Sequence, residues 1–386
     1  MLEVEVGFDG SCPQSPEGVR REGEGTFRVF PSWRTEPGLS EECLGRTTRL
    51  GFRVRNTSSV NASAVLHVDW QFNDAPPDAP RTFPSCEAYM ALRDFCAVQY
   101  PGSPRWRYEM AAVEGSVATL RLTLPPGTTE VHWHPPYNYT QGEAFMTGLR
   151  EREWTTVARL GTSREGRNLW LIRITDDTPR AKTPFCIRAR AHGYESGGSY
   201  TMEGMVGWLL SDDARAAQAR RDYEFFIVPM ANPDGVRNGM GKLTAPRGGN
   251  LDLSDPGVDE PGHTALMALL ARIRPAYLVD CHNWQSKVSD GILGMPTSHR
   301  ERFLYYMPDI SRHRKRWWTR DELPLEEPAP PREFLPHYCR RMYGSRRASF
   351  EISWFGRSPD DVRWFGANVL ASVLMALAEP ADLNQM

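Results

Sequence analysis

The chain has 386 residues, of which 40% are hydrophobic and 24% are charged, and its formal net charge is −2 at pH 7. This composition is typical of globular proteins and excludes a fibrous or wholly disordered chain. The length suits two domains of about 150 residues each. The near-neutral charge argues against nucleic acid as a partner, because binding to phosphates needs a strong positive field.

The start of the chain is acidic and lacks the cationic segment and apolar core of a signal peptide, so we expect a cytoplasmic protein. We expect no membrane partner, because no apolar run comes near the roughly 20 residues that span a bilayer. The seven cysteines are odd in number and scattered, which predicts reduced thiols rather than a disulfide framework.

The first 136 residues predict a small antiparallel β-sandwich, which forms an N-terminal domain over residues 1–136. Short alternating or apolar runs recur there, separated by turn-forming residues. Strands are predicted at residues 26–30, 49–55, 64–72, 106–110, 118–124 and 130–134. A segment rich in proline and tyrosine then leads into a second domain over residues 137–386.

After residue 150, predicted strands alternate with predicted helices, which indicates an α/β sheet with helices on both faces. A final helix begins after Ser358, which can cap it. Ligands of such sheets bind beyond the carboxyl ends of strands, and His192, His282 and Glu351 follow or close predicted strands. Strands are predicted at residues 155–162, 169–175, 184–191, 223–229, 276–281, 291–295 and 348–352, and helices at residues 199–210, 214–220 and 264–274.

Four side chains from three distant segments predict a hydrolytic zinc site. His192 and Glu195 follow one strand and suit two zinc ligands, and His282 closes another strand and suits the third. Glu351 is an acid in an otherwise apolar strand and suits the base that activates water. Each residue also has a structural interpretation, as a chance pair, a core histidine or a surface glutamate. Their order and context favour the zinc site.

These residues, in this order, resemble the zinc carboxypeptidase family. The pair His192 and Glu195 is followed by Asn232-Pro-Asp-Gly235, then by His282 and Glu351. The resemblance is strongest to the cytosolic carboxypeptidase branch, in which a β-sandwich also precedes the catalytic domain. It implies a mixed-sheet α/β catalytic domain, one Zn²⁺ ion per chain on the three ligands, and a peptide or small amide as substrate.

The chain departs from this family where the substrate's carbonyl is polarised. The family has an arginine a few residues after Asn-Pro-Asp-Gly, whereas Lys242 stands at that offset here. A lysine supplies positive charge but lacks the planar fork of arginine. We therefore expect Lys242 or Arg247 to stabilise the developing oxyanion. We expect Asp280 to orient His282 or to line the pocket.

The family's Asn-Arg pair, which binds the terminal carboxylate of the substrate, is altered as well. One alignment starts at Asn250 and another at Asp252, and neither contains the arginine. An acid enters the site in both, and it would repel a carboxylate and attract an amine. If both alignments are misplaced, Arg247 and Asn250 would form the pair that binds the terminal carboxylate of the substrate. The candidate substrate-binding residues are Asn250, Asp252, Asp255 and Trp284.

The sequence predicts a zinc-dependent hydrolase that cleaves a peptide or peptide-like amide bond, using metal-activated water and a glutamate base. The altered carboxylate clamp favours one alternative: a deacylase, amidase or esterase acting on a small metabolite without a free α-carboxylate. A non-enzymatic binding protein on an inactive hydrolase scaffold is the other alternative, and the presence of all three ligands and the base argues against it. The sequence leaves the substrate and the oligomeric state open.

Overall fold

The computed structural model describes residues 1–31, 49–69, 95–241, 249–257, 259–283, 289–308, 317–322, 324–325, 330–354 and 356–378. The chain divides into two compact units. The first unit comprises Met1–Thr140, His192–Ser196 and Asn232–Asn250, and the second comprises Gln141–Ala191, Gly197–Ala231 and Leu251–Met386. The domain boundary after residue 136 stays a prediction, because the first unit also takes in two later segments.

The first unit is built on a sheet whose described strands follow the order β1-β4-β9-β6-β7-β8-β5-β3-β2. Burial alternates along β8, so that Leu120, Leu122 and Leu124 face the core while the residues between them face outwards. The strands are β1 (Leu2–Glu5), β2 (Val19–Gly23), β3 (Thr26–Val29), β4 (Gly51–Asn56), β5 (Ala62–Asp69), β6 (Phe95–Gln99), β7 (Arg107–Glu114), β8 (Val117–Leu124) and β9 (Gly127–His132).

The predicted antiparallel sandwich is confirmed only in part. Strand β7 pairs with β6 through its first half and with β8 through its second half, so one strand joins two parts of the sheet. Inward side chains from both parts, such as Phe52 and Leu66, share one apolar core. The expectation of purely antiparallel pairing is wrong, because β3 and β5 pair in parallel. Parallel strands need a crossover, and here the connection includes β4 in the other part of the sheet.

The second unit contains the predicted mixed sheet, with its described strands in the order β10-β11-β13-β12-β14-β17-β15-β16. Strands β13, β12, β14 and β17 run parallel to one another, and antiparallel pairs flank them on both sides. The strands are β10 (Thr155–Thr162), β11 (Asn168–Ile174), β12 (Thr183–Ala189), β13 (Tyr223–Val228), β14 (Tyr277–Asn283), β15 (Gly291–Leu293), β16 (Trp318–Arg320) and β17 (Arg346–Ile352).

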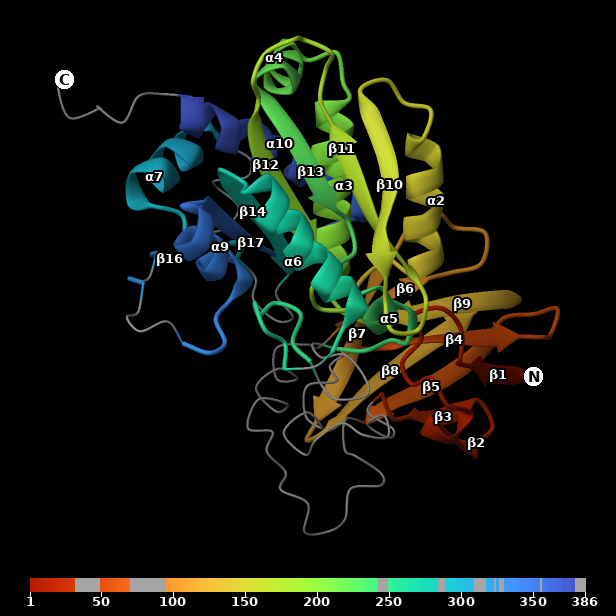
Figure 1. Cartoon of the computed structure of the whole chain (residues 1–386). Helices are drawn as coiled ribbons and strands as arrows, with labels where there is room; N and C mark the ends of the chain where they lie inside the picture. The colour runs from red at the N-terminus through yellow and green to blue at the C-terminus, as the bar shows by residue number, and fades with distance from the viewer. Residues whose placement is uncertain are drawn as a thin grey trace. The chain divides into compact units, whose positions relative to one another are not determined.

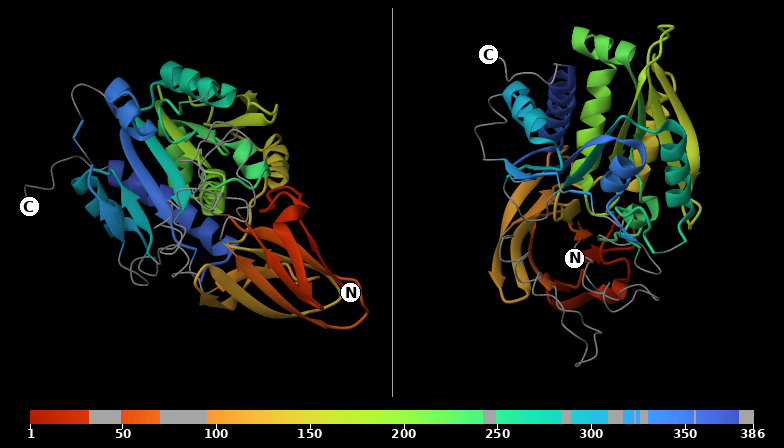
Figure 2. Two further views of the ribbon diagram at one scale, coloured as in Figure 1. Left: turned by 90° about the horizontal axis from the view of Figure 1, so that it is seen from below. Right: turned by 60° about the vertical axis from the view of Figure 1, so that its left-hand side comes forward.

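Helices cover both faces of this second sheet (Figures 1 and 2). Helices α6 and α9 lie on one face, over a core that includes Leu266, Leu278 and Cys339, and α3 and α10 lie on the other face. The helices are α2 (Tyr139–Leu149), α3 (Ser196–Leu209), α4 (Ala214–Asp222), α5 (Pro233–Arg237), α6 (Pro261–Ile273), α7 (Thr297–Tyr306), α9 (Leu335–Tyr343) and α10 (Pro359–Ala378).

Helix α10 corrects one sequence-based expectation. By length and composition alone its 20 residues could cross a membrane, so the statement that no run approaches this length is wrong. The structure buries 56% of its most apolar window. Its buried side chains include Val362, Phe365 and Val369, which belong to the apolar stripe that the sequence predicts.

Two glycines allow α3 and α10 to approach each other closely. A Cβ atom at Gly204 of α3 would overlap with the carbonyl oxygen of Arg363, and a Cβ atom at Gly366 of α10 would overlap with that of Thr201. Both neighbours are backbone atoms, which cannot move aside as a side chain does. The contact fixes the helix that follows the predicted ligands His192 and Glu195.

We expect Gly366→Ala to lower the free energy of unfolding by about 1–3 kcal/mol or more, because the added methyl group overpacks this contact. Urea unfolding followed by circular dichroism measures the change. The matched control is Gly207→Ala on α3, where a Cβ atom meets nothing within 4 Å. At this position the higher helix propensity of alanine should raise the free energy of unfolding by at most about 1 kcal/mol. Equal stability of the two variants would show that the helices are not packed this closely.

Candidate metal centre

The segment between β12 and α3 carries the first two predicted ligands. The Nδ1 atom of His192 lies 2.8 Å from Oε1 of Glu195, and its Nε2 atom lies 3.0 Å from Oδ1 of Asn250. Both ligand side chains are buried, with exposures of 3% and 1%. Both neighbouring oxygens accept hydrogen bonds, so the ring tautomer depends on what lies between Nδ1 and Glu195: a metal ion bound there would leave the ring proton on Nε2, facing Asn250.

Asn250, predicted to bind substrate, is instead in contact with His192, a predicted metal ligand. Metal-binding histidines usually donate their other ring N–H to an oxygen acceptor, which fixes the ring and its tautomer. The Asn250 amide does this for His192 within the first unit. This contact favours the alignment that starts at Asn250, in which Asp252 and Leu253 stand at the positions of the family's Asn-Arg pair.

His282 has an equivalent partner in the second unit. Side chains alternate along β14, so Asp280 and His282 project from the same face of the sheet. The Nε2 atom of His282 donates to Oδ2 of Asp280 at 3.0 Å. His282 is 4% exposed and Asp280 is 1% exposed. The Nε2 proton of His282 thus has an acidic acceptor, as the outer ring N–H of a metal-binding histidine usually does.

The predicted base lies beside this third ligand. Strands β14 and β17 are parallel neighbours, and His282 pairs in register with Glu351. Register partners project from the same face of a sheet. Glu351 is half-buried, whereas the residues before and after it, Phe350 and Ile352, are fully buried. The strand thus places a single carboxylate next to the histidine, as the sequence predicts.

A buried arginine that the sequence analysis missed holds the acids next to His282. Arg188 on β12 is 0% exposed and pairs in register with Asp280 on β14. Its Nε donates to Oδ1 of Asp280 at 2.9 Å, its Nη1 donates to the carbonyl oxygen of Leu251 at 3.0 Å, and its Nη2 donates to Oδ1 of Asp252 at 2.6 Å. Nη2 also donates to Oδ2 of Asp280. Asp252 is therefore part of an ion pair rather than an isolated acid.

This network sets the charge of Asp280. Burial raises the pKa of the Asp280 carboxyl, but Arg188 and His282 outweigh it and hold the pKa well below its usual range. Burial lowers the pKa of the Arg188 guanidinium, but Asp280 and Asp252 outweigh it and raise the pKa above its usual value. Asp280 thus stays an ionised acceptor for the ring N–H of His282.

The Asn-Pro-Asp-Gly motif forms the start of helix α5. Asn232 caps this helix, and its Oδ1 accepts a hydrogen bond from the backbone N–H of Gly235 at 2.8 Å. Pro233 occupies the first turn, where a missing N–H costs nothing. The residues of the motif are therefore explained by their part in forming this turn and helix start, and no role in ligand binding is needed to account for them.

A second arginine joins two segments of the first unit. Nη1 of Arg49 donates to the carbonyl oxygens of Gly193, at 3.3 Å, and of Val236, at 3.0 Å. Arg49 is 6% exposed, and burial lowers its pKa although Cys12 and Asp9 act in the opposite direction. It supports the loop that carries His192 and Glu195. The two contacts of Arg49 span 144 and 187 positions of the sequence, so no local sequence pattern reveals them.

Other predicted site residues lie away from these contacts or outside the described residues. Asp255 is exposed, and its Oδ1 accepts from the N–H of Gly257 at 2.8 Å, which closes a turn. Lys242, Arg247 and Trp284 lie outside the described residues. Their proposed roles remain predictions.

Among the described residues, His192 and Glu195 of the first unit and His282 of the second unit each offer a buried donor atom that suits a metal ion, and Asp252, Asp280 and His282 form a second candidate set within the second unit. Two imidazoles and a carboxylate suit Zn²⁺, and the hydrogen bonds at Nε2 of both rings fit binding through Nδ1. The second set already has Arg188 bonded to both of its acids. The first set therefore fits zinc, whereas the second set is neutralised by a guanidinium.

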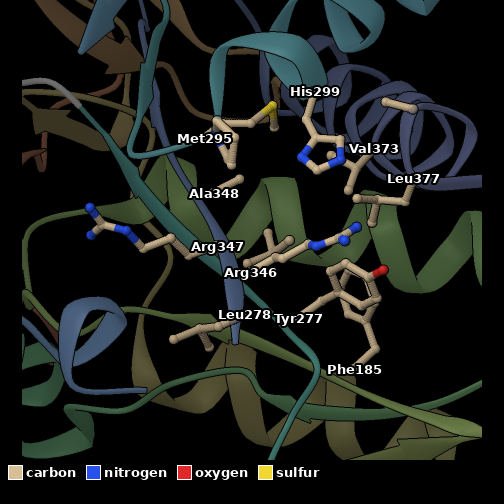
Figure 3. A pocket seen from close by; sticks show the side chains of 13 residues that line it. Phe185, Tyr277, Leu278, Met295, His299, Arg346, Arg347, Ala348, Val373 and Leu377 are labelled. Atoms are coloured by element: carbon tan, nitrogen blue, oxygen red, sulfur yellow. The ribbon is translucent and has the colours of Figure 1, made fainter. Parts of the chain in front are cut away.

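A separate, partly open hollow lies at the other end of β14 and β17 (Figure 3). Its walls are mainly apolar and include Phe185, Val279 and Val373. Tyr277, which begins β14, lines it and lies 5.9 Å below the guanidinium of Arg346. His282 lies five positions after Tyr277 along the strand, or roughly 16 Å away. The hollow is therefore not part of the candidate metal centre.

Comparisons with known proteins connect these features to one group of enzymes. A family model described as zinc carboxypeptidase matches residues 143–245. Cytosolic carboxypeptidase 6 of Caenorhabditis elegans is 38% identical over 106 residues, which cover 26% of this chain and 23% of that protein. Cytosolic carboxypeptidase 4 of Mus musculus is 47% identical over 160 residues, which cover 35% of this chain and 14% of that protein. The chain thus spans less than a quarter of the length of these relatives.

The fold is shared with solved structures over nearly the whole chain. The metallo-carboxypeptidase from Burkholderia cenocepacia superposes with a TM-score of 0.76 at 17% identity, and the match covers 98% of this chain and 99% of that chain. This likeness confirms the predicted fold class, a mixed-sheet α/β region preceded by a sheet-rich region.

Proposed function

We propose that this chain, which belongs to the zinc carboxypeptidase family, is a zinc-dependent hydrolase of peptide or peptide-like amide bonds. The observation that carries the proposal is the matching orientation of two histidines. Nε2 of His192 faces Asn250 and Nε2 of His282 faces Asp280. Nδ1 is then the atom of each ring that would bind the metal ion, and a carboxylate, Glu195, stands beside Nδ1 of the first ring.

His192, Glu195 and His282 would hold one Zn²⁺ ion. Chain connectivity supports this, since β12 and β14 are parallel neighbours whose carboxyl ends lie at one edge of the sheet. His192 and Glu195 follow β12, and His282 lies at the end of β14. When bound, zinc supplies Lewis acidity, which makes water a stronger acid and polarises a carbonyl group.

The proton moves through Glu351. Its carboxylate accepts a proton from the attacking water and delivers it to the leaving nitrogen. Asn250 and Asp280 hold the two imidazole rings through their Nε2 protons during this transfer. Lys242 or Arg247 remains our proposal for the positive charge that stabilises the developing oxyanion, and Asp255 and Trp284 remain candidates for substrate contact.

One observation favours a second function, hydrolysis of a small amide or ester without a free α-carboxylate. Arg188 does not replace the missing carboxylate-binding arginine, because it is 0% exposed. Its guanidinium donates to Asp280, Asp252 and Leu251. It therefore does not reach a substrate. We also propose a cytoplasmic location, because the curated relatives are named cytosolic carboxypeptidases.

The test compares two blocked dipeptides that differ only in a free C-terminal carboxylate or a C-terminal amide. We expect cleavage that a chelator abolishes and one equivalent of Zn²⁺ restores. A preference of about 100-fold or more for the free acid identifies a carboxypeptidase, since a site built to bind a charged group rejects the analogue that lacks it. Similar rates identify the amidase alternative. Stoichiometric zinc without cleavage of any amide or ester substrate would contradict the proposal.

A further inference from the structure

We propose that Arg188 is a built-in cation that occupies the place of a second metal ion next to the zinc centre and positions the zinc ligand His282. The inference rests on the proposed role of His282 in zinc binding. It concerns only residues of the second unit, all of which the structure describes.

The three groups around the guanidinium form a cation site without it. Asp252 and Asp280 each offer a buried carboxylate oxygen, and Nε2 of His282, the atom that donates to Asp280 here, becomes a third donor when it loses its proton. Nε2 of His282 lies 3.0 Å from Oδ2 of Asp280 and 3.7 Å from Oδ1 of Asp252. Two carboxylates and an imidazole are ligands that divalent metal ions prefer. Such a set, buried together, requires a positive charge.

Arg188 supplies that charge in fixed form. Its planar fork binds both oxygens of Asp280 and one oxygen of Asp252, and its remaining contact is the carbonyl oxygen of Leu251. A divalent ion at the same place would be repelled by the guanidinium and would find the carboxylate oxygens taken. Arg188 therefore restricts the centre to one metal ion.

The same contacts control the third zinc ligand. Both oxygens of Asp280 bind the guanidinium, and one of them also accepts the Nε2 proton of His282. The carboxylate cannot rotate without breaking a bond to Arg188. Arg188 is thus a positioning residue that acts on the metal ion through Asp280 and His282, as the outer partners of metal ligands commonly do.

The experiment is a zinc titration of the purified full chain against a competing chelator, with metal content measured on the isolated protein. We expect one equivalent of Zn²⁺ for the wild type. For Arg188→Met we expect a second, weaker equivalent and a 10- to 100-fold loss of affinity at the first site, about the size found for outer partners of metal ligands. Arg188→Met/Asp252→Asn should bind a single equivalent, because the second site loses a carboxylate.

A matched control separates these effects from a general loss of stability. Arg220 is also a buried arginine, 4% exposed, and its Nη1 donates to the carbonyl oxygen of Ser211 at 3.2 Å. Arg220→Met should destabilise the fold but keep one equivalent of zinc with wild-type affinity. If Arg188→Met does not fold, Arg188→Lys carries the test: its charge should keep the stoichiometry at one, while the lost fork weakens zinc binding.

The inference would be overturned if Arg188→Met bound zinc with the stoichiometry and affinity of the wild type. If Arg188→Met does not fold, an unchanged zinc affinity in Arg188→Lys would overturn it. A wild-type chain that binds no zinc would instead remove the proposed function, and the inference with it. The two failures are therefore distinguished by the wild-type titration alone.

Discussion

Replacing Glu351 by glutamine should lower kcat by about 10²- to 10⁴-fold, the usual contribution of a positioned general base. Glutamine has nearly the same shape but cannot accept the proton from water. Because Glu351 lies next to His282 on the neighbouring strand and is not among the proposed ligands, the variant should still bind one equivalent of zinc. Steady-state kinetics at saturating substrate, together with metal analysis, measure both properties.

Glu224→Gln is the matched control for this variant. Glu224 belongs to β13 of the same sheet but lies at the opening end of its strand, where it forms an ion pair with Arg173. We expect kcat within about twofold of the wild type, since exposed ion pairs contribute little to stability. A Glu351→Gln enzyme with the activity of this control would show that another group accepts the proton.

Loss of the third ligand should have an effect of similar size for a different reason. We expect His282→Ala to lower kcat/KM by about 10³-fold or more, because the metal contributes several kcal/mol to transition-state stabilisation and each 1.4 kcal/mol corresponds to a factor of ten. In contrast to Glu351→Gln, the protein should also lose stoichiometric zinc. Titration against a chelator measures the affinity independently of catalysis.

His299→Ala serves as the control for the removal of an imidazole. His299 lies on α7 and lines the apolar hollow at the far ends of the strands (Figure 3). We expect this variant to retain zinc and activity. Retention of full zinc affinity in His282→Ala would contradict the proposed ligand set.

The sequence predicted the sheet that carries the site well, because each central strand is a short apolar run bounded by polar residues. The strand predicted at residues 155–162 is β10 (Thr155–Thr162), and the strands that carry His282 and Glu351 begin within two residues of the predicted positions. The chemistry of strand ends gives a local signal, since a histidine or an acid interrupts an apolar run. This is why His282 and Glu351 could be singled out.

The contacts that support the site could not be predicted in the same way. Arg188 lies inside a predicted apolar strand, and its partners Asp252 and Asp280 are 64 and 92 residues away. Only the pairing of β12 with β14 brings Arg188 and Asp280 together. Helices α7 and α9, which the sequence analysis missed, lie in a region whose mixture of basic, aromatic and proline residues hides their short periodic patterns.

The register of β14 and β17 limits how the chain can change in length. Side chains alternate along a strand, so inserting or deleting one residue shortly before Glu351 would turn its carboxylate to the opposite side of the sheet from His282. The outer pair of β10 and β11 already contains such an irregularity between Arg159 and Gly161. Single-residue insertions should therefore be tolerated in that outer pair and should abolish hydrolysis in the two central strands.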